Sequence, residues 1–285
     1  MEATIKARPK AKSGGKWWYY ALAIVFVVVY LLPIYVLMNL SVRTVQTMNS
    51  ALAWPALSDW NWSNYFSSLA NSDIWMGFKN SIIIAAATIV VEIVVSALAA
   101  YGIARSTSRI TAHIRTMNIL IMMIPGIALL VGTYGLMVKL KMVNTLLGLA
   151  LLSAAGGIPG TMFMYVNFIV SIPQALDEAA AIDGASIMRT FFSIILPQLK
   201  AVTVTRVIMT AVGSWNNYLM PMFLLTDKSK YTIILVIKAA FAGSNGVKNV
   251  PLACATCIVG LVPIIAIYLL MQRFIIEGQM DSAVK

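Results

Sequence analysis

Long apolar runs alternate with shorter polar segments along the whole chain. A helix needs roughly 20 mostly apolar residues to cross about 30 Å of hydrocarbon. The runs are continuous and do not alternate over ten-residue segments as the strands of a membrane barrel would, so they indicate helices. We therefore predict an all-α polytopic membrane protein. Its six transmembrane helices are expected at residues 17–40, 80–103, 116–138, 146–170, 202–225 and 250–272.

The polar segments divide the chain into a basic tail at 1–16, a transmembrane domain at 17–272 and a short tail at 273–285. Within the domain, the longest connection, 41–79, is rich in Trp, Asn and Ser. The remaining connections are expected at 104–115, 139–145, 171–201 and 226–249.

The distribution of lysine and arginine predicts the orientation in the membrane. With the N-terminus in the cytoplasm, 13 of the 21 Lys and Arg residues fall in segments on that side. Six spans return the C-terminus to the same side, so both termini and the loop 171–201 are expected in the cytoplasm. The first apolar run is too long for a signal peptide and no small-residue cleavage site follows it, so it is expected to remain as an anchor.

Composition agrees with a membrane location. The chain is 60% hydrophobic, more apolar than a soluble domain. Its net charge of +11 does not indicate nucleic-acid binding, because the basic residues are scattered among loops and the N-terminal tail, which suits anionic lipid. His113 is the only histidine, and Cys254 and Cys257 lie inside an apolar run, so no catalytic or metal site is predicted. We interpret the two cysteines as small packing residues.

The loop before the fifth span contains the stretch "DEAAAIDGAS", which holds three of the ten acidic residues. Pro173 suits the first turn of a helix and Gly184 its end. Asp177 and Glu178 lie near the positive end of the helix dipole. A helix of about ten residues is marginal on its own in water, so it needs a packing partner. The residues alone leave open an ordinary connecting loop without one.

A spaced motif identifies that partner by resemblance. The loop resembles the EAA-x3-G-x9-I-x-LP signature of ABC-importer permeases at Glu178, Ala179, Ala180, Gly184, Ile194, Leu196 and Pro197. The stretches "FKNSIIIA", "SWNNYLMPMFLL" and "QRFIIEGQMDSAVK" resemble the carbohydrate branch of that family, in particular the maltose-type second permease subunit. The similarity covers nearly the whole chain after about Trp17. "SAAGGIPGTMFMYVNF" departs from the family by being richer in small residues, so pore residues are not transferred there.

The resemblance implies the ABC importer permease fold and a coupling helix seated in a cleft of a cytoplasmic ATPase subunit. Glu178 would make polar contacts in that cleft, Ala179 and Ala180 would allow close packing, and Gly184 would form the turn that ends the helix. Asp183 belongs to the same expected coupling set. A bacterial inner-membrane location is implied with these roles.

Energy is expected to come from other polypeptides. The chain lacks a GxxxxGK[ST] phosphate loop, so ATP and Mg²⁺ would be bound by two partner ATPase subunits and no cofactor is expected in this chain. The expected partners also include a second permease subunit in a heterodimer, an extracytoplasmic solute-binding protein and the lipid bilayer.

Polar and small residues within the spans are candidates for the substrate pathway. Glu92 could be hydrogen-bonded to neighbouring helices, line a pore or form a structural ion pair. The "GGIPG" stretch around Gly157 could break the fourth span at mid-depth, as in transporters, or allow close helix packing. The other candidates are Tyr134, Trp215, Asn216, Asn217 and Tyr218.

The predicted function is a permease subunit that forms half of the pathway for a sugar, with a di- or oligosaccharide as the expected substrate. Related permeases also carry glycerol phosphate and polysaccharide fragments. The alternative is a self-sufficient secondary transporter with Glu92 as its ion site, although no inverted repeat is evident. An intramembrane enzyme would need catalytic residues that the sequence does not offer.

Overall fold

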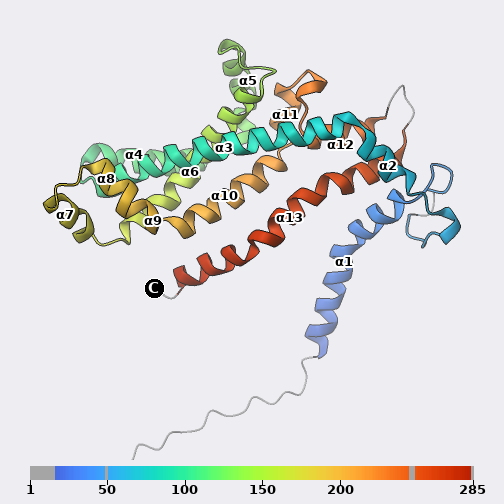
Figure 1. Ribbon diagram of the computed structural model, residues 1–285, viewed down its shortest axis with the longest axis horizontal. Coiled ribbons are helices and arrows are strands. Elements are labelled where there is room, and N and C mark those ends of the chain that lie inside the picture. The colour runs from blue at the N-terminus through green and yellow to red at the C-terminus, as the bar shows by residue number, and fades with distance from the viewer. Residues whose placement is uncertain (1–16, 49–50, 244–247, 284–285) are drawn as a thin grey trace, which may run out of the picture.

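The computed structural model describes residues 17–48, 51–243 and 248–283, with side chains as far as residue 269 (Figure 1). These ranges are helical and contain no strand. The long helices are α1 (Trp17–Ser41), α3 (Ser72–Arg105), α6 (Leu146–Val170), α10 (Lys200–Trp215) and α13 (Val250–Ala283). The shorter ones are η1 (Leu57–Asp59), α2 (Ser63–Ala70), α4 (Arg109–Met122), η2 (Gly126–Leu129), α5 (Leu130–Lys139), α7 (Ala175–Ile182), α8 (Ile187–Thr190), η3 (Phe191–Ile195), α9 (Leu196–Gln198), α11 (Leu219–Leu224), η4 (Lys228–Lys230) and α12 (Ile233–Ala242).

The all-α prediction is confirmed, and the span count depends on two bent elements. Four helices are long and apolar enough to cross a membrane, namely α1, α3, α6 and residues 250–269 of α13. The bent pairs 109–122 with 126–139 and 187–198 with 200–215 raise the number to six if each pair counts as one span.

The third predicted span is broken rather than continuous. Its helix begins at Arg109, ends at Met122, and meets the following helical segment at 93°. Pro125 accounts for the break, because proline disfavours a helical conformation in the residue before it and cannot donate a backbone hydrogen bond. The prediction of one helix over 116–138 was therefore wrong.

The fifth predicted span is also interrupted. α10 ends at Trp215, and the chain leaves the helix at Asn216 before α11 begins at Leu219. Asparagine side chains compete for nearby backbone groups, which disfavours the middle of a helix. Pro221 lies in the first turn of α11, where its missing N–H costs least.

The connections also hold more helix than expected. α3 begins at Ser72, eight residues before the predicted span, and Asn71 caps it by accepting a 2.9 Å hydrogen bond from the Asp73 amide. The apolar helix α12 occupies the predicted polar loop 226–249. α13 continues as helix to Ala283, through most of the predicted tail.

The centre of the molecule is the packing of α3 against α6. Hydroxyl groups join the two helices: Thr88 donates to the Ala150 carbonyl at 3.3 Å and Ser96 to the Ile158 carbonyl at 3.4 Å. α7 and α8 lie at one end of this pair, and α2 and α12 at the other (Figure 1). We call these the α7 end and the α12 end.

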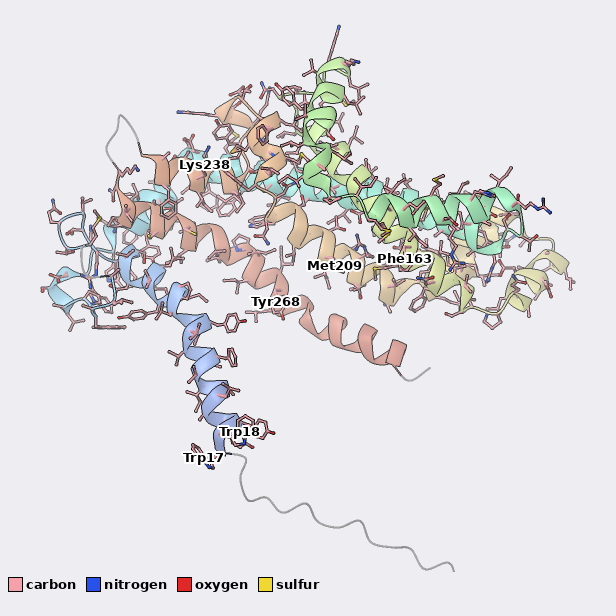
Figure 2. All side chains as sticks on the ribbon, turned by 180° about the vertical axis from the view of Figure 1, so that it is seen from behind. Trp17, Trp18, Phe163, Met209, Lys238 and Tyr268 are labelled. Atoms are coloured by element: carbon pink, nitrogen blue, oxygen red, sulfur yellow. The ribbon has the colours of Figure 1, made fainter. Side chains whose placement is uncertain are left out.

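α1 stands apart from the bundle along most of its length (Figure 1). Trp17 and Trp18 lie at its free end (Figure 2). The apolar window of α1 has no buried residue, whereas about a third of the corresponding windows in α6 and α13 is buried. Its apolar side chains are therefore free to contact lipid or another subunit.

Candidate functional site

The main cavity lies where the two broken elements meet the central helix pair. It encloses about 710 Å³ and is lined from α3, α4, α5, α6, α10 and α11. Residues of both breaks contribute to its wall, Ile124 and Gly126 from the first and Asn217 from the second. Non-helical backbone at membrane depth is tolerated where it lines a cavity, so the breaks fit this position.

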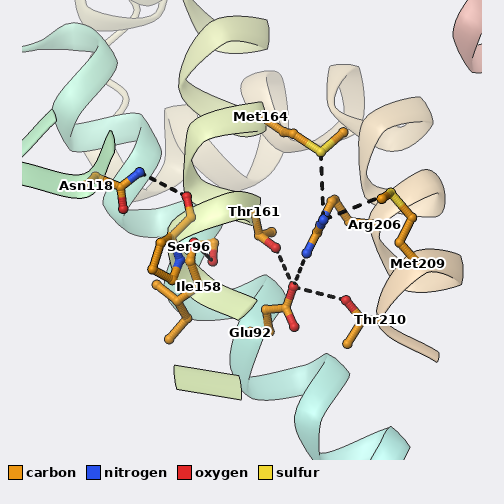
Figure 3. Close-up of polar contacts among 10 residues, drawn as sticks. Glu92, Ser96, Asn118, Ile158, Thr161, Met164, Arg206, Met209 and Thr210 are labelled. Atoms are coloured by element: carbon orange, nitrogen blue, oxygen red, sulfur yellow. Dashed lines mark hydrogen bonds and ion pairs between the residues drawn. The ribbon is translucent and has the colours of Figure 1, made fainter. Parts of the chain in front are cut away.

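Glu92 of α3 occupies the wall of the cavity and joins three helices (Figure 3). Its Oε1 accepts from Arg206 Nη2 of α10 at 2.6 Å, from Thr210 Oγ1 at 3.0 Å and from Thr161 Oγ1 of α6. The Glu92 side chain is only 2% exposed and that of Arg206 13%. Two of the roles considered for Glu92 are combined in the structure: it is hydrogen-bonded to neighbouring helices and forms an ion pair. Both interactions lie at the wall of the cavity.

Arg206 is the residue that sequence reasoning missed in this site. In the sequence it appears only as one of the 13 Lys and Arg residues expected on the cytoplasmic side. Its Nη1 lies 3.9 Å from the sulfur of Met164 and 4.0 Å from that of Met209, so this nitrogen faces two uncharged thioethers. An arginine inside an apolar helix that contains no acid is itself a signal for a partner on another helix.

Gly157 gives the Glu92 carboxylate its space. A Cβ built on Gly157 would lie 2.2 Å from Glu92 Oε2. α6 runs without interruption through Gly156–Gly160, so the idea that this stretch breaks the span was wrong. Close packing, the alternative, holds at Gly157 but not at Gly156, where a Cβ would meet no atom within 4 Å. Asn118 of α4 donates to the Pro159 carbonyl at 2.9 Å and holds α4 against the same stretch (Figure 3).

The structure brings only some of the predicted pathway residues together. Glu92, Gly157 and Asn217 line the main cavity, and Tyr134, Trp215, Asn216 and Tyr218 do not. The ring of Trp215 is buried and stacks on Phe78 with 6.0 Å between ring centroids. In the described ranges, no three His, Cys, Asp or Glu side chains lie close enough to hold a metal ion.

α7 forms a second candidate site at the end of the bundle. Glu178, Ala179, Asp183 and Gly184 are exposed, and Ala180 is buried against the protein. Gly184 has a φ of 75° and ends the helix in a Schellman turn: the Ala185 amide donates to the Ala180 carbonyl at 2.9 Å, and the Gly184 amide to Ala181 at 3.0 Å. The short helix and its glycine end are thus as the sequence indicated, but the helix begins at Ala175, so Pro173 precedes it and does not lie in its first turn.

Asp177 fixes α7 to the bundle, and sequence reasoning gave it no such role. Its carboxylate is 2.8 Å from Arg105 Nη2 and accepts a 2.7 Å hydrogen bond from Tyr101, both on α3. Arg105 Nη1 also donates to the carbonyls of Ile169 and Ile172, which precede α7. The exposed motif is therefore held by the end of α3.

Comparison with known proteins identifies the family of this chain. Residues 92–278 match the family described as "Binding-protein-dependent transport system inner membrane component". This chain belongs to that family. The permease is 32% identical over 265 residues to the melibiose/raffinose/stachyose import permease protein MelC of Bacillus subtilis, an alignment that covers 93% of this chain and 95% of MelC. It is also 32% identical over 212 residues to the sn-glycerol-3-phosphate permease protein UgpE of Salmonella typhi, covering 74% and 75% of the two chains.

The fold of the permease matches a solved structure over almost its full length. A chain in the crystal structure of a bacterial ABC transporter involved in the import of the acidic polysaccharide alginate superposes with a TM-score of 0.81. The alignment covers 93% of this chain and 99% of that chain at 18% sequence identity. This similarity establishes the ABC importer permease fold.

Proposed function

We propose that this permease forms half of the translocation pathway of an ATP-driven importer for a di- or oligosaccharide. MelC is named for melibiose, raffinose and stachyose, and a second relative, MsmG of Streptococcus mutans, is named for multiple sugars at 33% identity. The cavity wall carries the hydroxyl and amide side chains of Thr88, Ser153 and Asn217, which suit the hydroxyl groups of a sugar.

The proposed complex contains a second permease subunit, two ATPase subunits that hold ATP and Mg²⁺, and a solute-binding protein. A neighbouring structure in the same fold contains a periplasmic protein bound to an alginate pentasaccharide, which supports the last of these partners. We place the complex in a bacterial inner membrane with both termini and α7 on the cytoplasmic side.

The observation that carries the proposal is that one helix serves both sites. α3 holds α7 through Tyr101 and Arg105 and reaches the cavity through Glu92. Glu92 and Arg105 are thirteen residues apart, roughly 20 Å along a helix. A displacement of α7 by an ATPase subunit would therefore reach the cavity through a continuous helix.

The test is uptake of radiolabelled raffinose into proteoliposomes that hold the assembled complex, with ATP inside and binding protein outside. Glu178→Ala should reduce uptake and sugar-stimulated ATP hydrolysis to near background without lowering thermal stability, because Glu178 is exposed. Gln198→Ala is the control, since Gln198 is an exposed residue of the same connection outside the motif. If the Glu178→Ala and Gln198→Ala complexes take up raffinose at the same rate, Glu178 has no role in coupling. Uptake by this chain alone without ATP would instead favour an ion-coupled secondary transporter.

A further inference from the structure

The charge of the cavity wall rests on two residues. Among the described residues that line the cavity, Glu92 and Arg206 are the only ionisable ones. The other polar groups of the wall are neutral hydroxyls and an amide, for example Thr133, Ser153 and Asn217. Since Glu92 and Arg206 are 2.6 Å apart, their charges cancel and the wall carries no net charge.

The surroundings of the pair favour this cancellation. Thr161 and Thr210 direct their hydroxyls at the same carboxylate oxygen as Arg206, so three donors hold the Glu92 carboxylate beside the guanidinium. On the other side, Arg206 faces the sulfur atoms of Met164 and Met209. Without Glu92, its charge would act through a poorly screened interior and attract anions strongly.

We propose that the Glu92–Arg206 pair is the charge filter of this half of the pathway: because the two charges cancel, the wall favours neutral sugars and offers no counter-charge to an anionic one. The family includes permeases named for an anion, sn-glycerol 3-phosphate, so membership alone does not decide the charge class of the solute. The inference rests on the proposed function, because it names the class of sugar that the same cavity admits. Glu92 is the residue on which the selection depends.

The experiment measures the electrostatic potential of the cavity directly, in the assembled complex in lipid nanodiscs. Cys254 and Cys257 are replaced by alanine, and Ser153→Cys introduces a thiol at the cavity wall. Its rates of reaction with an anionic (sulfonate) and a cationic (trimethylammonium) methanethiosulfonate reagent are compared. In the parent, the ratio of the two rates should match that of a free thiol in solution.

Glu92→Gln should raise the anion-to-cation ratio roughly tenfold by leaving Arg206 uncompensated, and Arg206→Gln should lower it by a similar factor. The double variant Glu92→Gln/Arg206→Gln should restore the parent ratio. Unchanged ratios in both single variants would overturn the proposal. If neither single variant can be purified as a folded complex, recovery of a folded double variant supports mutual cancellation, and a double variant that also fails to fold overturns it.

The thiol measurement needs no transport, so it separates this inference from the proposed function. If the single variants show no change in the ratio of rates while the parent complex takes up sugar normally with ATP, the charge filter is wrong and the importer assignment stands. Ratio shifts as expected in a complex that takes up no sugar would keep the filter and overturn the proposed function.

Discussion

The two ion pairs of α3 place the same chemistry in different surroundings. The inner pair, Glu92–Arg206, lies at the cavity, and three donors converge on one carboxylate oxygen. The outer pair, Asp177–Arg105, lies at the α7 end, where the side chains are 20% and 14% exposed. The inner pair joins three long helices, whereas the outer one fastens an eight-residue helix to the bundle.

The different exposure of the two pairs predicts that breaking them has different effects on the free energy of unfolding. Leaving a charge buried without its partner costs about 3–5 kcal/mol, whereas ion pairs that water can reach contribute about 0–1 kcal/mol. The two atoms that form the outer pair, Asp177 Oδ2 and Arg105 Nη2, are covered, but their side chains are partly exposed, so the outer pair lies between these two limits. We therefore expect changes at the inner pair to affect stability, and changes at the outer pair to affect mainly the position of α7.

Among substitutions that leave Glu92 and Arg206 unchanged, the largest effect is expected from Gly157→Ala, which disturbs the inner pair without removing a charge. The added Cβ would lie 2.2 Å from Glu92 Oε2 and 2.9 Å from Oε1, so the carboxylate must shift and its hydrogen bonds to the three donors are disturbed. We expect a loss of about 2–3 kcal/mol in the free energy of unfolding. Denaturant unfolding in detergent would measure it.

Gly156→Ala is the matched control, because nothing lies within 4 Å of a Cβ built there. It should be neutral or slightly stabilising, since alanine is the better helix former. Equal destabilisation by the two neighbouring substitutions would mean that the inner pair does not depend on the space at Gly157.

A smaller effect is expected from Asp177→Asn at the outer pair. The amide can still accept from Tyr101 but loses the charge that meets Arg105, so we expect a loss of about 1 kcal/mol. Sugar-stimulated ATP hydrolysis should fall more than stability does, because α7 would lose its fixed position. If Asp177→Asn lowered the free energy of unfolding by more than Gly157→Ala does, the outer pair would matter more for stability than the inner one, contrary to this prediction.

The smallest effect is expected from Gly184→Ala, which acts on the end of α7 and not on either pair. Alanine pays a steric cost at a φ of 75°, so the turn should lose about 1 kcal/mol or less. Hydrogen exchange at the amides of Gly184 and Ala185 would report its loosening. Gly102→Ala in α3 is the control: its added Cβ meets no atom within 4 Å, and these amides should exchange as in the parent.

Local features of the fold could be predicted from the sequence, and long-range ones could not. The α7 helix and its glycine turn follow from neighbouring residues, which is why Pro173 and Gly184 located them. The break at Pro125 also had a local signal, but the apolar run around it obscured it. α12 was missed because Ile233–Ala242 is too short to span a membrane and was grouped with its polar flanks.

The two ion pairs show the limit of sequence reasoning most directly. Arg105 and Asp177 are 72 residues apart, and Glu92 and Arg206 are 114 residues apart. Nothing in the spacing relates them, because their meeting depends on how α3 packs against α6 and α10. Asn217 could be proposed from its chemistry alone, whereas the buried position of Trp215 could only be seen in the packing.

The missing side chain at position 157 has a consequence for how such permeases can diverge. With an alanine at position 157, only a residue shorter than glutamate fits at position 92. A shorter or neutral residue at 92 in turn leaves the arginine at 206 without its ion-pair partner. Across related chains, these three positions are therefore expected to be inherited as a set. A related permease that came to carry an acidic solute instead of a neutral one would therefore have to change all three positions together. A change at one position alone would destabilise the membrane domain.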